Sequence, residues 1–424
     1  MSSTTPSFLV IGGGIGGLAA ALALAHDGHT VRVLERAPEF TEVGAGLQIG
    51  PNASRVLERL GVLDAVTATA FFPNRLTLRD AMTGERLVSL KTEDAFQNRF
   101  GHRYFVAHRA DLHHALLTAC RESGLVELLP GKEVVRVEPQ RPGAVVHCAD
   151  GTVHSSGALV AADGLHSRVR RLLVGDAEPV DSGYVAHRGT VPIEALAGTG
   201  GLREPDSMVI WVGPGMHLVQ YPVRRGKLCN QVAAFDTRRY TQHAGDHGAQ
   251  LRAAFAAACH DVQAGIALMD SSRRWPMLDR PPVTGWSRDG ITLVGDAAHP
   301  MLQYLAQGAC QAIEDSVALA DRVAAHPGDP QTAFDEFEAI RAPRTARVQT
   351  AARAWGEVLH IDGMGARLRD AFVAGRAEDD YGVMDWLYGF DAADTHGAGP
   401  QAAGSARSEP APDTTPHTPR EIPA

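Results

Sequence analysis

The stretch Phe8-Leu9-Val10-Ile11-Gly12-Gly13-Gly14-Ile15-Gly16-Gly17 decides the fold of this chain. Its four apolar residues predict a short buried strand, and the Ala- and Leu-rich run from Leu18 to Ala25 predicts a helix directly after the glycines. A second strand is predicted from Thr30 to Leu34. This order of strand, helix and strand predicts the beginning of a parallel α/β sheet.

Gly12, Gly14 and Gly17 have the GxGxxG spacing of a dinucleotide-binding turn. The first glycine permits the tight turn, the second lets the backbone approach a pyrophosphate, and the third lets helix and strand pack closely. The helix N-terminus then offers unpaired N–H groups to the anion. Glu35 and Arg36 end the second strand, where an acid can accept hydrogen bonds from ribose hydroxyls. GxGxxG alone is a weak signal, but this context predicts a bound dinucleotide.

Two later segments place an acid after a predicted buried strand: Ala162-Asp163-Gly164 and Gly295-Asp296-Ala297-Ala298-His299-Pro300. Asp296 can bond a polyol such as a ribityl chain, and a helix N-terminus near Gly308 would stabilise negative charge on a reduced flavin. Each segment alone is also compatible with a plain turn, and Asp163 with a helix cap. Their order after the glycine-rich turn predicts FAD, stretched across the whole domain, rather than NAD at one edge.

The composition is that of a soluble globular protein, with 44% hydrophobic and 21% charged residues among 424. A formal net charge of -9 argues against nucleic acid as the main partner. The five cysteines are scattered without a CxxC pair, so we expect reduced thiols in a cytoplasmic protein and no metal site. No run of 18 apolar residues occurs, so no transmembrane helix is expected.

The region between residues 180 and 280 contains short strands of a different, largely antiparallel character. The predicted fold class is therefore α/β, with a Rossmann-type FAD-binding domain and C-terminal helices over residues 1–179 and 281–391. Residues 180–280 are predicted to form an inserted, mainly antiparallel β-sheet substrate domain. Residues 392–424 lack apolar periodicity and are predicted to be a disordered tail.

His217, Val219 and Tyr221 would lie on one face of a strand in the inserted sheet, because alternate strand residues point to the same side. An imidazole and a phenol on one face can bind and deprotonate a phenolic substrate. Both side chains are also compatible with structural roles, Tyr221 as a half-buried strand aromatic and His217 as a hydrogen-bonded residue at the rim. Gln303, in the loop after Pro300, is predicted to face the space between the two domains.

Together these motifs resemble those of the single-component FAD-dependent aromatic hydroxylases, the group A flavoprotein monooxygenases, over about residues 8–390. The resemblance implies that Glu35 and Arg109 bind FAD and that Asp296 binds its ribityl region. It also implies that the segment containing Asp163 contacts both FAD and the pyridine nucleotide, and that the protein is a homodimer. The predicted cofactor-binding residues are Gly12, Gly14, Gly17, Glu35, Arg36, Arg109, Asp163, Asp296, Pro300 and Gly308.

Two segments, His217–Pro222 and His299–Cys310, are similar to those of the 3-hydroxybenzoate 6-hydroxylases within this family. The resemblance implies that His217 is the base or proton relay, that Tyr221 holds the phenolate and that Gln303 orients the substrate. It also implies NADH or NADPH and O2 as co-substrates, and a flavin C4a-hydroperoxide as the hydroxylating species. The reaction would convert 3-hydroxybenzoate to 2,5-dihydroxybenzoate (gentisate).

Three other interpretations remain open at the level of the sequence. The enzyme could hydroxylate salicylate, a hydroxynicotinate or another phenol by the same chemistry. It could instead be an FAD-dependent reductase or dehydrogenase that needs no O2, or a flavin-binding protein without catalysis. The sequence places no arginine in the substrate pocket, so it does not identify a partner for the substrate carboxylate.

Overall fold

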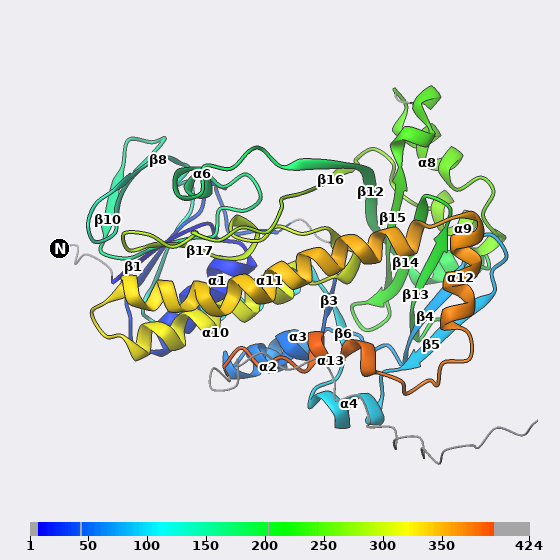
Figure 1. Cartoon of the computed structure of the whole chain (residues 1–424), viewed down its shortest axis with the longest axis horizontal. Coiled ribbons are helices and arrows are strands. Elements are labelled where there is room, and N and C mark those ends of the chain that lie inside the picture. The colour runs from blue at the N-terminus through cyan, green and yellow to red at the C-terminus, as the bar shows by residue number, and fades with distance from the viewer. Residues whose placement is uncertain (1–6, 43–44, 202, 244, 394–424) are drawn as a thin grey trace, which may run out of the picture. The chain divides into compact units, whose positions relative to one another are not determined.

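Figure 1 shows the computed structural model of the chain, which describes residues 7–42, 45–201, 203–243 and 245–393. From residue 394 onward, the predicted disordered tail lies outside the described residues. The described residues up to Ala393 belong to one compact unit. No helix within these ranges is long and apolar enough to cross a membrane.

A five-stranded parallel sheet, in the order β17-β11-β1-β2-β7, forms around the glycine-rich segment. Its central strand β1 (Phe8–Ile11) pairs with β2 (Val31–Leu34) and β11 (Leu159–Ala161). The edge strands are β7 (Val126–Leu129) and β17 (Ile291–Leu293). All four residues of β1 are buried, and the predicted Rossmann-type arrangement is confirmed.

Both faces of this sheet are covered, because alternate residues of β1 belong to two different cores. One core contains α1 (Ile15–His26) and α10 (Gly308–Ala325), which pack directly on each other. The other core contains residues of a three-stranded sheet in the order β10-β9-β8. Its strands are β8 (Val134–Pro139), β9 (Ala144–Cys148) and β10 (Val153–Ser156). The result is a three-layered domain with the glycine-rich turn at one edge of the parallel sheet.

A second large sheet has seven strands in the order β16-β12-β15-β14-β13-β4-β5. All its pairs are antiparallel except that of β13 with β4. Residues 180–280 do not supply this sheet alone, because β4 (Arg75–Asp80) and β5 (Arg86–Lys91) extend it. The remaining strands are β12 (Val180–Pro192), β13 (Ser207–Gly213), β14 (Met216–Val223), β15 (Leu228–Asp236) and β16 (Trp275–Asp279).

The long helix α11 (Pro330–His360) connects the two large sheets. It contacts β17 in the first sheet and β13 and β14 in the second, and Figure 1 shows it running along both. Near its middle, the buried Arg341 donates hydrogen bonds to Glu314 at 2.5 Å and to Asp315 at 2.7 Å, which fixes α11 on α10. On the far side of the second sheet, α8 (His247–Ala254) and α9 (His260–Ala267) cover a separate core.

The other elements are short and join these layers. The remaining strands and helices are β3 (Gly46–Ile49), β6 (Phe105–His108), α2 (Pro51–Arg59), α3 (Leu63–Thr67), α4 (Asp94–Phe100), α5 (Arg109–Glu122), α6 (Arg168–Leu173), α7 (Ile193–Gly198), α12 (Gly363–Val373) and α13 (Asp385–Tyr388). The short 3₁₀ helices are η1 (Thr237–Arg239), η2 (Thr241–His243), η3 (Gly295–Ala297), η4 (Gln303–Leu305) and η5 (Gly382–Met384).

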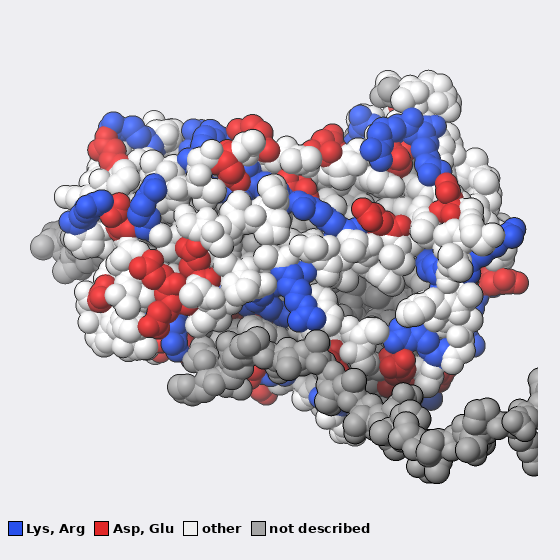
Figure 2. Space-filling model, viewed as in Figure 1, with Lys and Arg blue, Asp and Glu red and all other residues white. Residues whose placement is uncertain are grey.

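Charged side chains of both signs are interspersed on the face of the molecule drawn in Figure 2. Many of the arginines are paired with a nearby acid, as Arg59 is with Asp321 and Arg99 with Asp385. Exposed pairs of this kind contribute little to stability, typically about 0–1 kcal/mol. The polar interactions that bear on function therefore have to be sought inside the protein.

Candidate cofactor site and active site

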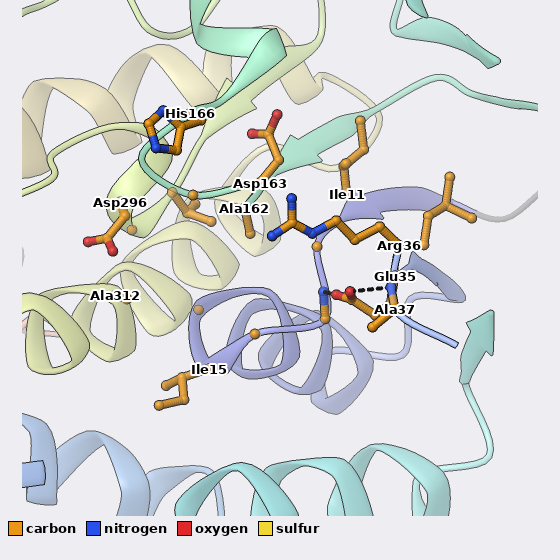
Figure 3. Close-up of a pocket in the computed structure, with 18 of the residues that line it drawn as sticks. Ile11, Ile15, Glu35, Arg36, Ala37, Ala162, Asp163, His166, Asp296 and Ala312 are labelled. Atoms are coloured by element: carbon orange, nitrogen blue, oxygen red, sulfur yellow. Dashed lines mark hydrogen bonds between the residues drawn. The ribbon is translucent and has the colours of Figure 1, made fainter. Parts of the chain in front are cut away.

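A cavity of about 720 Å³ lies at the carboxyl ends of β1, β2, β11 and β17. Ligands of parallel α/β sheets bind at this edge, and pockets for them typically measure roughly 300–1,000 Å³. Figure 3 shows Arg36, Asp163 and Asp296 around this space. Eight of the predicted cofactor-binding residues line it: Gly12, Gly14, Glu35, Arg36, Arg109, Asp163, Asp296 and Gly308.

The three glycines of the turn differ in what surrounds them. Gly12 has a φ of 105°, and a Cβ there would lie 2.3 Å from the carbonyl oxygen of Ala162. A Cβ at Gly17 would lie 2.0 Å from the carbonyl oxygen of Gly12, so Gly17 packs beneath the turn rather than lining the cavity. At Gly14 a Cβ would meet only Glu42 Oε1, at 3.8 Å. Gly14 therefore leaves the cavity side of the turn open for a ligand to approach the backbone.

The carboxylate of Glu35 holds this turn in place. Its Oε2 accepts a hydrogen bond from Gly13 N at 2.7 Å, and its Oε1 accepts one from Ala37 N at 2.8 Å (Figure 3). Each oxygen keeps a second lone pair, which a ribose hydroxyl can use. The neighbouring helix α1 begins at Ile15, and its N-cap residue Gly14 has no side chain to cap it; no acid lies in its first turn. Its free N–H groups are therefore available to an anion.

Arg109 begins α5 and forms a bidentate pair with Glu42. Its Nε and Nη2 each donate to a carboxylate oxygen of Glu42 at 2.9 Å. Burial lowers the pKa of the guanidinium, but the hydrogen bonds and charge of Glu42 outweigh it and leave the pKa raised. Arg109 therefore stays protonated at the cavity wall, where Glu42 balances its charge. Glu42 is a lining residue that the sequence did not reveal.

Asp163 has one carboxylate oxygen bonded and one free. Its Oδ2 accepts hydrogen bonds from the backbone N–H groups of Arg168 and Val169, so the capping interpretation is partly correct. Oδ1 is buried without a partner among the described residues. Burial raises the pKa of this carboxyl, although the hydrogen bonds from Ser167, Arg168 and Val169 oppose the rise. A ligand hydroxyl would satisfy the free oxygen.

Asp296 and the start of α10 form the opposite end of the cavity. Asp296 lines the cavity. Desolvation by the surrounding protein raises the pKa of its carboxyl, and His299 and Arg109 oppose the rise. A Cβ at Gly308 would lie 3.8 Å from Asp296 Oδ1. Among the described residues, no side chain caps α10 and no acid lies in its first turn. Its first residues Gly308 and Ala309 line the cavity, so the helix N-terminus faces this space.

Pro300 does not line the cavity, although it was predicted to bind the cofactor. It is buried, and its carbonyl oxygen accepts a hydrogen bond from Gln349 at 2.8 Å. The cavity contains three basic residues that were not predicted: Lys132, Arg168 and Arg171. The basic pair of α6 could have been noticed, since it directly follows the Asp163 segment in the sequence.

His217 lies on the predicted face of β14, together with Val219 and Tyr221. The intervening residue Leu218 packs with α8 and α9 on the other side of the sheet. His217 is 2% exposed, so it is not at a rim, and its Nδ1 lies 2.7 Å from Nε2 of His360. Burial and the neighbouring His360 lower the pKa of the His217 imidazole well below its ordinary value. The imidazole is therefore neutral, and burial makes it a weaker base than a free imidazole.

Tyr221 is 2% exposed and lies next to the backbone of Gly46. A Cβ added at Gly46 would lie 2.8 Å from the Tyr221 hydroxyl. Burial raises the pKa of this hydroxyl, and the positive charge of Arg188 and a hydrogen bond with Gln48 oppose the rise only in part. The Tyr221 hydroxyl is therefore protonated at neutral pH and can donate a hydrogen bond.

Gln303 lies in η4 and contacts β12 of the seven-stranded sheet. Its Oε1 accepts a hydrogen bond from Nη2 of Arg188, and its Nε2 makes only a long contact of 3.9 Å with the sulfur of Met277. None of His217, Tyr221 and Gln303 lines the cavity described above. His217 and Tyr221 lie on one face of the seven-stranded sheet, and Gln303 contacts that sheet through Arg188 of β12. Arg188 is the residue that the sequence did not place among them.

The cavity residues fit FAD. Two helix N-termini without side-chain caps and the cations Arg36 and Arg109 suit a pyrophosphate and an electron-rich flavin. The unpaired Oδ1 of Asp163 and the carboxylate of Glu35 suit hydroxyl donors. The open side of Gly14 leaves room for close approach.

Comparison with known proteins agrees with this fit. Residues 5–352 match the FAD binding domain family. The chain is 39% identical to the 3-hydroxybenzoate 6-hydroxylase of Polaromonas naphthalenivorans over 90% of this chain and 96% of that protein. It is 38% identical to the 3-amino-4-hydroxybenzoate 2-monooxygenase PtnB3 of Streptomyces platensis, over 93% and 98%.

A solved structure shows the same fold with the cofactor bound. The crystal structure of Klebsiella pneumoniae HpxO complexed with FAD and uric acid is similar with a TM-score of 0.79 and 28% identity, covering 90% of this chain and 95% of that one. The family match covers most of the chain, and the relatives align over nearly their whole length. The protein therefore belongs to the FAD-dependent aromatic-ring monooxygenases.

Proposed function

We propose that this enzyme hydroxylates 3-hydroxybenzoate to 2,5-dihydroxybenzoate, with NADH and O2 as co-substrates. The observation that carries the proposal is one face of β14 with a neutral imidazole and a protonated phenol, in a chain 39% identical to a 3-hydroxybenzoate 6-hydroxylase. Both groups suit a phenolic substrate, since one can accept the phenolic proton and the other can donate a hydrogen bond to the resulting oxyanion.

Bound FAD would accept a hydride from NADH and, in its reduced form, activate O2. The protein's own part is to raise the electron density of the ring. His217 takes the phenolic proton directly or through a relay, and its contact with His360 fixes the orientation of the imidazole. Tyr221 donates a hydrogen bond to the phenolate, and Gln303 orients the ring through its free amide N–H. For a 3-hydroxybenzoate, the position para to the phenolate is carbon 6.

Two variants and one control test these roles. General-base assistance is typically worth about 10²–10⁴-fold, so His217→Ala should lower the hydroxylation rate within that range. Tyr221→Phe should lower both the rate and the fraction of NADH that yields product. His114→Ala changes an exposed histidine of α5 and should have no effect. Unchanged rate and coupling in both site variants would contradict the assigned roles.

A substrate panel tests the choice of substrate separately. It should contain 3-hydroxybenzoate, salicylate, 6-hydroxynicotinate and 3-amino-4-hydroxybenzoate, with products identified by mass spectrometry. We expect 3-hydroxybenzoate to give the highest kcat/KM and a 2,5-dihydroxy product. A higher value for another phenol would keep the reaction class and replace the substrate.

We also propose that the enzyme is a cytoplasmic homodimer. Its five cysteines are all free. On α12, the apolar residues Met364, Leu368 and Phe372 recur every four positions and are 67%, 64% and 78% exposed, as expected for a surface that a second copy covers. Analytical ultracentrifugation should give twice the chain mass of 45.1 kDa. Leu368→Asp should shift the protein toward the mass of a single chain. A wild-type monomer would contradict the proposal.

A further inference from the structure

We propose that Arg188 is the receptor for the carboxylate of the aromatic acid substrate. This inference rests on the proposed function for the identity of the acid, and it assigns a binding role to a residue that neither the sequence motifs nor the comparisons indicate. Arg188 lies in the middle of β12, a strand of the seven-stranded sheet.

The sheet register places Arg188 on the same face as the proposed catalytic residues. Arg188 pairs with Val232 of β15, and Val232 pairs with Val219 of β14. Directly paired residues in antiparallel strands project to the same side of a sheet. Val219 lies between His217 and Tyr221 on that side, so the guanidinium projects from the face that bears the imidazole and the phenol.

The hydrogen bonds of Arg188 leave its positive charge without a counterion. It is half-buried, and no described Asp or Glu forms an ion pair with it. Its Nη2 donates to the neutral amide of Gln303, and its Nε is buried without an acceptor in the part of the chain that the structure describes. By contrast, Arg109 has Glu42, and Arg341 has Glu314 and Asp315. Arg188 is thus a half-buried cation that lacks an anionic partner among the described residues. Burial lowers the pKa of its guanidinium.

A carboxylate completes this arrangement. The planar guanidinium can donate two parallel hydrogen bonds to two carboxylate oxygens, and such charged pairs are stronger than neutral ones. β12 and β14 are separated by one strand, and Tyr221 lies two residues along from the position in register with Arg188. The two side chains therefore arise from backbone positions about 12 Å apart on the sheet. A benzoate ring with a meta hydroxyl can bridge long side chains at that spacing, with its carboxylate on Arg188 and its phenol on Tyr221. A second unpaired donor, Nδ2 of Asn230, lies beside Tyr221 on the same face.

The test measures binding of benzoate, which has the carboxylate but no phenol and cannot be hydroxylated at an activated ring. Isothermal titration calorimetry of the FAD-loaded enzyme compares benzoate with neutral benzamide. Arg188→Met should weaken benzoate binding by about 10–100-fold, as expected for the loss of charged hydrogen bonds, and should leave benzamide within twofold. Arg136→Met removes the same charge from the exposed strand β8 and should change neither ligand.

A second variant leaves Arg188 in place. Gln303→Glu puts a carboxylate against the guanidinium and should compete with benzoate, lowering its affinity by a similar factor while benzamide binding stays. The inference is overturned if benzoate binds Arg188→Met and Gln303→Glu as it binds wild type, if benzoate and benzamide lose affinity together, or if wild type binds both equally. Because benzoate binding needs no turnover, failure of 3-hydroxybenzoate as substrate leaves this result unaffected.

Discussion

Nδ1 of His217 lies 2.7 Å from Nε2 of His360, so the last residue of α11 makes a hydrogen bond to the middle of the seven-stranded sheet. The two rings also stack, with centroids 5.0 Å apart. Burial lowers the pKa of both imidazoles, that of His360 to about 3. Both rings are therefore neutral at pH 7, and one N–H is shared between them. This contact connects the proposed base to the helix that joins the two large sheets.

The His217–His360 pair predicts a pH dependence of stability. The pKa of His360 is about 3 in the folded protein and about 6.5 when unfolded, so the unfolded chain binds its proton first as the pH falls. The stabilising contribution is complete above pH 6.5 and is lost progressively between about pH 6.5 and pH 3. His360→Gln keeps a hydrogen-bonding group but cannot titrate, so its Tm should fall less than that of wild type between pH 6.5 and 4.5. His114→Gln, an exposed control, should follow wild type. Equal slopes for His360→Gln and wild type would contradict the assignment.

Two glycines of the turn are expected to respond differently to substitution by alanine: one variant should lose stability and the other should lose FAD affinity. Gly17→Ala places a methyl group 2.0 Å from the Gly12 carbonyl oxygen, so the helix must move and the protein should lose about 1–3 kcal/mol of stability. Gly14→Ala meets no protein atom closer than 3.8 Å, so it should fold normally but bind FAD about tenfold more weakly or worse, because the methyl group occupies the cofactor's side of the turn. Thermal unfolding of the apoproteins and FAD titration separate the two effects. Normal FAD affinity in Gly14→Ala would argue against this turn as the pyrophosphate site.

Glu35 supports the same turn through both carboxylate oxygens. Glu35→Gln keeps one acceptor and turns an N–H group toward a backbone N–H, which removes a charged hydrogen bond worth about 1.5–3 kcal/mol. We expect a 10–100-fold loss of FAD affinity, measured by fluorescence titration. Glu39→Gln, an exposed neighbour with the same change of charge, should bind FAD as wild type does. A similar loss in both variants would point to general electrostatics instead.

The sequence predicted individual strands and helices, and the side of a strand on which a residue lies. The strand at Phe8, the helix at Gly308 and the same-side placement of His217 and Tyr221 follow from periodicity, glycine spacing and strand geometry. The pairing of β4 with β13 does not follow from local pattern, because its paired residues, such as Arg75 and Ser207, lie far apart in the sequence.

The parts of the site that were not predicted have the same cause. His360 reaches His217 from the end of a helix 143 positions away in the sequence. Arg188 reaches Gln303 across 115 positions. Neither residue lies in a recognisable motif. The charge of Arg188 becomes informative only because no Asp or Glu of the described ranges pairs with it.

The most direct test of the account is hydroxylation of 3-hydroxybenzoate with NADH under ¹⁸O2, with product identified by mass spectrometry and counted against NADH consumed. We expect one 2,5-dihydroxybenzoate per NADH, with one ¹⁸O atom in the new hydroxyl group. Product without ¹⁸O, or NADH oxidation in air that yields no hydroxylated aromatic product from any phenol of the panel, would contradict it.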